Sequence, residues 1–167
     1  MSEKLAIYAG SFDLLTTGHL WMIEQGACLF DRLLVSIGTN PNKQCMFSLE
    51  DRLKMLKQST KQFPHVTIES FPFQYLITYA GTKNAQFLLR GIRSQKDYEA
   101  EREMRNINGD FNENITTIFL IPPRKLVEVS SSMVKGLIGP QGWQEVVKNY
   151  LPEPVFEFLI RSQGGQS

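Results

Sequence analysis

Residues 5–19 read Leu-Ala-Ile-Tyr-Ala-Gly-Ser-Phe-Asp-Leu-Leu-Thr-Thr-Gly-His, which predicts a buried strand, a polar loop and the start of a helix. The loop matches neither the dinucleotide fingerprint nor the Walker A pattern, because it lacks their glycine spacing and a Gly-Lys-Ser/Thr. Gly10 lets backbone approach a ligand, beside the Ser11 hydroxyl. The unpaired N–H groups near Gly18 suit a phosphate, and a cationic or hydrogen-bonding His19 could stabilise charge there, although a single histidine at a helix start is more often structural.

The same strand-and-helix unit recurs along the chain. Short apolar runs, each separated by a segment long enough for a helix, lie at residues 5–8, 32–38, 66–70, 87–90 and 117–121. Strands that alternate with helices form a parallel sheet, so we predict an α/β fold with a doubly wound five-stranded parallel sheet in a single domain over residues 1–167. In such a sheet, ligands bind beyond the carboxyl ends of the strands.

The helices are predicted from apolar spacing and from residues that favour helix ends. The expected helices cover residues 18–30, a stretch after Ser48, 97–108, 130–138 and 154–160, and a frayed tail follows over 163–167. In the first helix one apolar stripe should pack on the sheet, formed by Leu20, Ile23, Ala27 and Phe30. The heavily charged segment 97–108 has few apolar positions, which indicates an exposed helix.

The composition argues against several partners. The 167 residues include 18 Lys and Arg against 17 Asp and Glu, so a formal net charge of +1 attracts neither nucleic acid nor an anionic membrane. The sequence has neither a signal-peptide pattern nor a run of about 20 apolar residues, so we expect a cytoplasmic protein. Cys28 and Cys45 have no metal or redox spacing and are predicted to be reduced thiols, and His65 is predicted to be a surface loop residue.

Polar residues also follow three other predicted strands, at 40–43, 90–93 and 122–132. Together with residues 10–19, these segments should meet at one edge of the sheet and form a single site. The strand ending at Arg90 would deliver two guanidinium groups, because Gly91 and Arg93 follow it, and guanidinium forks suit phosphate oxygens.

Three serines precede the predicted helix over 130–138. One hydroxyl is sufficient to cap a helix, so the others could bind the β and γ phosphates of a nucleotide, with Lys135 as a counter-charge. The sequence contains no cluster at metal-ligand spacing, so any magnesium would arrive with the nucleotide, held by phosphate oxygens and water.

These segments together resemble the bacterial phosphopantetheine adenylyltransferases, members of the nucleotidylyltransferase superfamily that carry a Thr/His-x-Gly-His motif. The likeness runs from about residue 5 to the end of the chain. The matching pieces, in order, are Tyr-x-Gly-Ser-Phe-Asp from Tyr8, Thr-Thr-Gly-His from Thr16, Asn-Lys from Asn42, Met-Phe-Ser-Leu-Glu-Asp-Arg from Met46, Leu-Arg-Gly-Ile-Arg from Leu89, Asp-Tyr-Glu from Asp97 and Val-Ser-Ser-Ser from Val129.

The resemblance implies a Rossmann-like nucleotidylyltransferase fold and direct in-line attack by 4'-phosphopantetheine on the α-phosphate of ATP, releasing pyrophosphate. It also implies Mg²⁺ as cofactor and a homo-hexamer. The implied catalytic residues are His19, Lys43 and Arg90. The implied acceptor-binding residues are Ser11, Lys43, Leu76, Arg90 and Asn108. The implied ATP-binding residues are Gly10, Ser11, Phe12, His19, Gly91, Ile92, Arg93, Glu101, Leu126, Val129, Ser130, Ser131 and Ser132, and no residue is implied as a metal ligand.

The chain departs from the family pattern at a few positions, and these bear on the acceptor more than on nucleotidyl transfer. The departures are Ala9, Leu14, Gln74, Tyr75, Ala100 and Leu126. Two alternatives therefore stay open. One is a related nucleotidylyltransferase that uses another phosphorylated acceptor, such as nicotinamide mononucleotide or a sugar or glycerol phosphate. The other is a non-catalytic nucleotide-binding protein.

Overall fold

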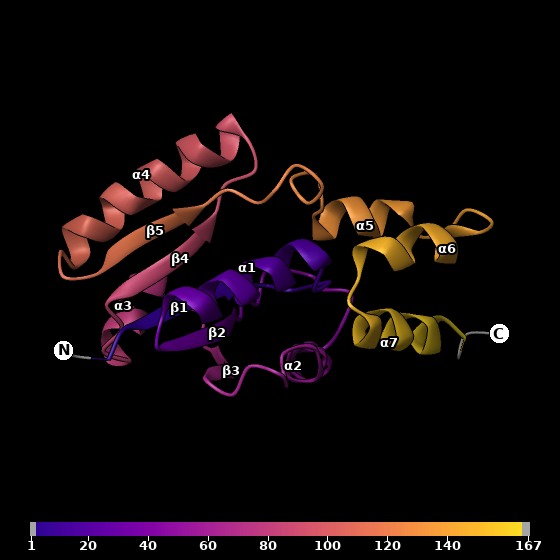
Figure 1. Cartoon of the computed structure of the whole chain (residues 1–167), viewed down its shortest axis with the longest axis horizontal. Helices are drawn as coiled ribbons and strands as arrows, with labels where there is room; N and C mark the ends of the chain where they lie inside the picture. The colour runs from indigo at the N-terminus through magenta and orange to yellow at the C-terminus, as the bar shows by residue number, and fades with distance from the viewer. Residues whose placement is uncertain (1–2, 165–167) are drawn as a thin grey trace.

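The computed structural model describes residues 3–164 and confirms the predicted doubly wound sheet (Figure 1). All pairings between the five strands are parallel, in the order β3-β2-β1-β4-β5. The strands are β1 (Leu5–Gly10), β2 (Arg32–Gly38), β3 (Val66–Phe71), β4 (Phe87–Gly91) and β5 (Thr116–Leu120). Each lies within two residues of a predicted apolar run, because a parallel sheet covered on both faces needs nearly continuous apolar strands.

The side chains of β1 alternate between two separate apolar cores. Ala6 and Tyr8 join the larger core, while Leu5 and Ile7 join the smaller core on the opposite face of the sheet. Successive residues of a strand point to opposite faces, so one short segment anchors both layers of helices. The central position of β1 places the loop that follows it in the middle of the carboxyl edge of the sheet.

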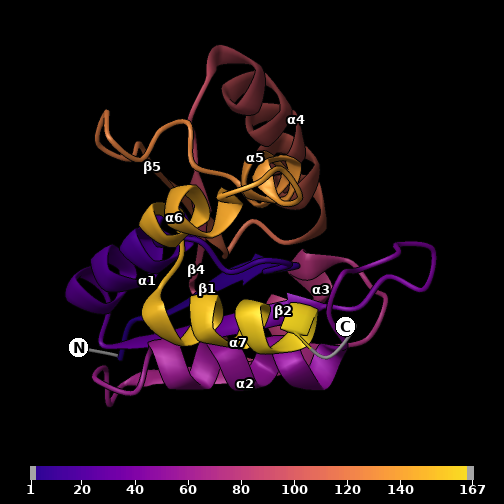
Figure 2. The ribbon, with the colours of Figure 1, turned by 90° about the vertical axis from the view of Figure 1, so that its right-hand side faces the viewer.

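Seven α-helices and one 3-10 helix surround the sheet within residues 3–164. They are α1 (Thr17–Leu29), α2 (Leu49–Ser59), α3 (Leu76–Thr82), α4 (Gln95–Phe111), α5 (Ser131–Leu137), α6 (Trp143–Val147), η1 (Lys148–Tyr150) and α7 (Glu153–Gly164). Ser48 caps α2 by accepting a hydrogen bond from the Asp51 amide, as its position before the acidic first turn predicts. Figure 2 shows α7 packed against α2 at the end of the chain.

The apolar face of α1 differs in part from the predicted stripe. Ile23, Ala27 and Phe30 are buried as expected, but Leu20 is only half-buried. The close contact with the sheet is made instead around Gly26, where an added Cβ would lie 2.9 Å from the side chains of Leu33 and Leu89. The helix therefore turns a glycine towards the strands, a role that apolar spacing does not reveal.

Two other predictions need correction. The ring of His65 is half-buried, and its Nε2 lies 2.7 Å from the carbonyl oxygen of Ala27, so this residue ties the loop before β3 to α1. The predicted tail begins inside α7, which continues to Gly164, and residues 165–167 lie outside the described residues. The charged segment 97–108 does form an exposed helix, since α4 contains no buried residue. None of the helices described between residues 3 and 164 has the length and apolar character needed to cross a membrane.

Candidate active site

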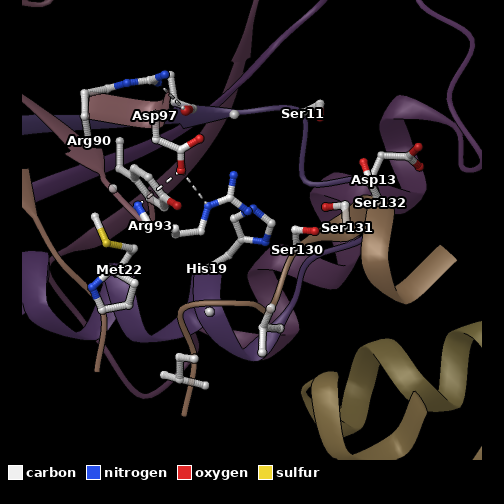
Figure 3. A pocket seen from close by; sticks show the side chains of 18 of the residues that line it. Ser11, Asp13, His19, Met22, Arg90, Arg93, Asp97, Ser130, Ser131 and Ser132 are labelled. Atoms are coloured by element: carbon white, nitrogen blue, oxygen red, sulfur yellow. Dashed lines mark hydrogen bonds and ion pairs between the residues drawn. The ribbon is translucent and has the colours of Figure 1, made fainter. Parts of the chain in front are cut away.

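A cavity of about 390 Å³ opens at the carboxyl edge of the sheet, where the four polar segments meet as predicted (Figure 3). Thirteen residues predicted for the site line it: Gly10, Ser11, His19, Lys43, Arg90, Gly91, Arg93, Glu101, Leu126, Val129, Ser130, Ser131 and Ser132. They come from the carboxyl ends of β1 and β4, the loops after β1, β2 and β4, and the segment that leads from β5 into the start of α5. His19 lies on α1 and Glu101 on α4. The parallel topology brings these loops together, although up to 122 positions separate them in the sequence.

Four other predicted residues do not line this cavity. Phe12 is 1% exposed and lies beneath it, with its ring edge-on to Tyr8 and to His19. Ile92 is buried, and its amide bonds to the Leu120 carbonyl at the end of the neighbouring strand. Leu76 starts α3 against the smaller core, and Asn108 is half-buried on α4. If Leu76 and Asn108 contact a ligand, they must therefore contact a part of that ligand that extends beyond the cavity.

The ring of His19 is held in one orientation by the capping box of α1. Its Nδ1 accepts a hydrogen bond from the Thr16 amide at 3.1 Å and lies 2.9 Å from the Thr16 hydroxyl. Because the amide can only donate, Nδ1 carries no proton, and the neutral ring is protonated at Nε2. Burial, with the positive charge of Arg93 as a second cause, lowers the pKa of His19 from 6.5 to about 4. Of the two roles considered for His19, the free protein therefore favours the neutral hydrogen-bond donor.

This arrangement predicts a low titration midpoint for His19. In a proton NMR titration of the free protein, the ring signals of His19 should shift near pH 4, and added ATP should raise that midpoint because phosphate favours the imidazolium. A His65→Asn variant assigns the signals, since the chain has two histidines. The unfolded state binds the proton more tightly, so the stability contributed by neutral His19 is complete above about pH 6.5 and is lost as the pH falls towards 4. A midpoint near 6.5 in the free protein would contradict the assigned tautomer and burial.

Arg90 is oriented by a two-pronged ion pair with Glu101 of α4. Its Nε donates to Oε2 at 2.9 Å and its Nη2 to Oε1 at 2.5 Å. Its Nη1 donates to the Ala9 carbonyl at 3.2 Å. The guanidinium is thus fixed on one edge, and the remaining N–H groups can bind a phosphate. Glu101 was predicted to line the ATP site, and the structure adds that its carboxylate positions Arg90.

Asp97 holds Arg93 in a similar way and was not among the predicted site residues. One carboxylate oxygen, Oδ2, accepts from the Arg93 amide at 3.1 Å and from its Nε at 3.0 Å. The signal in the sequence was an opposite charge four residues after Arg93. In the structure, Asp97 lies in the first turn of α4 and Arg93 lies just before that helix. The pair keeps a second guanidinium beside the cavity.

Ser11 and Lys43 lie side by side on the other flank of the cavity. The Lys43 Nζ donates to the Ser11 hydroxyl at 3.1 Å. Behind them, the Nη1 of Arg52 donates to the Ser11 carbonyl at 2.8 Å, and its Nε donates to the Phe47 carbonyl at 3.2 Å. Arg52 is 7% exposed and supports this loop from within α2, a role that its place in a charged helix did not reveal.

The three serines before α5 have different partners. Ser130 caps the helix by accepting from the Met133 amide, which confirms the capping interpretation. Ser131 donates to the Leu14 carbonyl at 2.6 Å, so its hydroxyl is also engaged in structure. Ser132 is exposed and faces the cavity. Of the hydroxyls predicted to bind phosphates, Ser132 is therefore the most accessible.

Eight further residues line the cavity and were not among the predicted site residues. They are Tyr8, Ala9, Asp13, Gly18, Met22, Asp97, Pro122 and Lys135. Two of them were considered: Gly18 at a helix start that suits a phosphate, and Lys135 as a counter-charge. At Gly18 an added Cβ would lie 3.1 Å from the Val129 carbonyl, so the glycine allows the segment before α5 to lie directly on the start of α1. Burial raises the pKa of Tyr8, which therefore remains a neutral phenol at the floor of the cavity.

Each carboxylate that lines the cavity pairs with a cation. Asp13 pairs with Lys135, Asp97 pairs with Arg93, and Glu101 pairs with Arg90. Within residues 3–164 no three His, Cys, Asp or Glu side chains are grouped as metal ligands. This donor set fits a divalent ion that is carried by phosphate oxygens better than one held by the protein alone.

Comparison with known proteins places this geometry in a family. The family profile described as cytidylyltransferase-like matches residues 7–137. A phosphopantetheine adenylyltransferase of Chromobacterium violaceum is 51% identical over 157 residues, which covers 94% of this chain and 96% of the relative. The enzyme of the same name from Neisseria meningitidis serogroup C is 50% identical over 159 residues, covering 95% and 94%.

Solved structures confirm the fold independently. The nicotinic acid mononucleotide adenylyltransferase of Plasmodium falciparum, solved as a complex with NaAD, superposes with a TM-score of 0.69. The match covers 96% of each chain at 14% sequence identity. At this identity the likeness establishes the arrangement of strands and helices alone.

Proposed function

The chain belongs to the cytidylyltransferase-like family, among the phosphopantetheine adenylyltransferases, and from this premise we propose that it transfers an adenylyl group from ATP to 4'-phosphopantetheine. The products are dephospho-coenzyme A and pyrophosphate. The observation that carries the proposal is a single cavity lined by an oriented imidazole, His19, by the Ser11–Lys43 pair and by the serine-rich start of α5.

We assign the acceptor phosphate to the flank formed by Ser11, Lys43 and Arg90. The Lys43 ammonium and the free edge of the Arg90 guanidinium supply positive charge, and the Ser11 hydroxyl supplies a hydrogen bond. The Arg90–Glu101 pair limits the movement of the guanidinium, so little ordering is needed when the phosphate binds. The acceptor phosphate oxygen thereby becomes the nucleophile without any covalent bond to the protein.

We assign the nucleotide to the opposite flank. We assign Ser132, Lys135 and Arg93, which all line the cavity, to the phosphates that leave as pyrophosphate. The start of α1 and the segment 126–129 line the rest of this flank, with Gly18 allowing their close approach. In this arrangement the leaving group and the nucleophile lie on opposite sides of the α-phosphate, as in-line displacement requires.

His19 lies where charge accumulates in the transition state. Its Nε2–H can donate to a non-bridging oxygen of the α-phosphate, while Thr16 fixes the ring from behind. A neutral donor held in position stabilises developing charge with little reorganisation. Catalysis in this scheme consists of positioning and charge stabilisation, because both reacting groups belong to the substrates.

We propose Mg²⁺ as the cofactor, carried by the phosphate oxygens of ATP. It would neutralise charge on the leaving pyrophosphate, and the cation-paired carboxylates of the cavity are consistent with an ion that needs few protein ligands. We also propose the cytoplasm as the place of reaction, since ATP and magnesium are available together there.

An exchange assay tests the proposed function. The protein is incubated with magnesium, labelled pyrophosphate and dephospho-coenzyme A, and label should appear in ATP. The same assay with nicotinamide adenine dinucleotide tests the related acceptor. Label only with the second compound would transfer the assignment to another acceptor, and no label with either would leave a nucleotide-binding protein without this activity.

We further propose that the chain assembles as a homo-hexamer, with α4 at an interface. Exposed apolar side chains line one face of this helix: Met104 is 51% exposed, Ile107 47% and Phe111 61%. An apolar stripe of this kind on a helix with no buried residue is typical of a surface that another copy covers.

The assembly can be tested by sedimentation velocity. The wild-type chain should sediment as a species of six copies, and a Met104→Glu, Ile107→Glu double variant should shift to smaller species because it introduces charges into the covered face. Arg102→Ala, on the opposite side of the same helix, should keep the wild-type profile. A monomeric wild-type chain, or an unchanged double variant, would refute the role given to α4.

A further inference from the structure

Asp13 connects both flanks of the cavity, although neither the motif nor the proposed chemistry assigns it a role. The carboxylate is 1% exposed. On the acceptor side its Oδ2 accepts from the Met46 amide at 2.9 Å and its Oδ1 accepts from the Phe47 amide at 3.0 Å. On the nucleotide side the Lys135 Nζ of α5 donates to Oδ2 at 3.1 Å. Figure 3 shows Asp13 next to the serines at the start of α5.

Backbone carbonyls close to Asp13 in the sequence are also bonded to the two sides of the cavity. The Ser11 carbonyl accepts from Arg52 at 2.8 Å, on the acceptor side, and the Leu14 carbonyl accepts from Ser131 at 2.6 Å, on the nucleotide side. Residues 11–14 thus form a junction between the loop that carries Lys43 and the helix that carries Lys135. Within this junction, the Asp13 side chain forms hydrogen bonds to both elements.

The Asp13 carboxylate stays ionised in this setting. Burial alone would raise its pKa, but the hydrogen bonds from the Met46 and Phe47 amides and the nearby Lys135 ammonium together lower it below the ordinary value. All these partners are donors. An asparagine here would turn an NH₂ group towards at least one of them, because its amide has a single acceptor oxygen.

We propose that Asp13 is a positioning residue that holds the acceptor loop and α5 at a fixed separation across the reacting phosphates. The inference rests on the proposed adenylyl transfer, in which nucleophile and leaving group must be aligned about one phosphorus atom. Misplacement by about 1 Å can cost a hundredfold in rate. Asp13 would contribute by fixing the relation between the two half-sites and would contact neither substrate.

The product of the reaction provides a direct test. Dephospho-coenzyme A spans both half-sites, whereas AMP and 4'-phosphopantetheine each occupy one. We expect Asp13→Asn to weaken binding of dephospho-coenzyme A about 30-fold in calorimetry, while the dissociation constants of AMP and 4'-phosphopantetheine each change less than about threefold, because only the spanning ligand depends on the separation. An equal loss for 4'-phosphopantetheine would show that Asp13 serves the acceptor loop alone and would overturn the proposal. Unchanged binding of the spanning ligand would overturn it as well.

Lys135→Met covers the case in which Asp13→Asn does not fold. It removes the link to α5 and leaves the two backbone hydrogen bonds of Asp13 in place. Because AMP lacks the β and γ phosphates, a selective loss for dephospho-coenzyme A in this variant reports position rather than a lost triphosphate contact. Equal affinity changes for AMP and the spanning ligand would again contradict the proposal.

Two comparison variants complete the experiment. Asp97→Asn removes a cavity carboxylate that pairs with Arg93 on one flank only, so any change in the affinity for AMP should be matched by an equal change for dephospho-coenzyme A. Glu157→Gln disrupts an exposed pair on α7 and should change neither. If wild-type protein fails the exchange assay and does not bind dephospho-coenzyme A, the proposed function fails. Wild-type activity with no selective effect of Asp13→Asn refutes only the positioning role.

Discussion

Replacement of His19 by alanine is expected to lower kcat by about 10² to 10³-fold, the cost typical of losing one hydrogen-bond donor to a transition-state oxyanion. The dissociation constant of ATP should change little, because the proposed contact strengthens only as charge develops on the α-phosphate. The Nδ1 of His19 is already engaged by Thr16, so Nε2 is the nitrogen available for this contact. Steady-state kinetics of pyrophosphate release, with equilibrium binding of ATP, measures both quantities.

The second histidine provides a matched control for this prediction. His65 contacts the Ala27 carbonyl away from the cavity, so His65→Ala should keep wild-type kcat. His19→Gln should recover part of the lost activity, because its amide can donate from a nearby position. Near-normal turnover by His19→Ala would remove His19 from the mechanism.

The second large effect is expected at Arg90. Arg90→Ala should reduce kcat/KM for 4'-phosphopantetheine by about 10² to 10³-fold, since truncating one partner of a hydrogen-bonded charge pair costs about 2–5 kcal/mol. The substitution removes a proposed phosphate ligand and also leaves the Glu101 carboxylate, 16% exposed, without its main partner. The apparent KM for ATP should change far less, because Arg90 belongs to the acceptor flank. Initial rates with each substrate varied in turn distinguish the two parameters.

A double-mutant cycle separates the two roles of Arg90. Glu101→Gln should lower kcat/KM for 4'-phosphopantetheine less than Arg90→Ala does. The double variant should have a kcat/KM no lower than that of Arg90→Ala alone, because Glu101 acts by orienting the guanidinium. Arg90→Lys keeps the charge but loses the two-pronged geometry, so it should be intermediate. Arg161→Ala, at an exposed pair on α7, should behave as wild type. If Arg90→Ala raised the KM for ATP alone, the assignment of the two flanks would be wrong.

Most of the fold could be predicted because it depends on local patterns. Apolar runs of strand length mark all five strands, and Ser48 marks the start of α2 through a hydroxyl followed by acidic residues. The prediction of the apolar stripe on α1 was less accurate. The position closest to the sheet is Gly26, where the lack of a side chain allows the helix to approach the strands. Hydrophobic spacing cannot report a contact of that kind.

The location of the site could also be predicted, because it follows from the topology of the sheet. Polar residues after parallel strands must gather at one edge, and the cavity contains His19, Lys43 and Arg90 together. The sequence could not predict how these groups are supported. Arg52 resembles an ordinary charged residue of a surface helix, yet it is 7% exposed and bonds to the Ser11 and Phe47 carbonyls.

By itself, then, the sequence determined the class of fold, the edge of the sheet at which the cavity lies and most of the residues that line it, because periodicity and parallel topology depend on the order of residues. Only the tertiary structure decided the state of those side chains. The proton of His19 lies on Nε2 because an amide of Thr16 faces Nδ1, and Asp13 spans two flanks because α5 returns to it from 122 positions further along the chain. Such contacts depend on distances between segments far apart in the chain, and residue order carries no direct record of those distances.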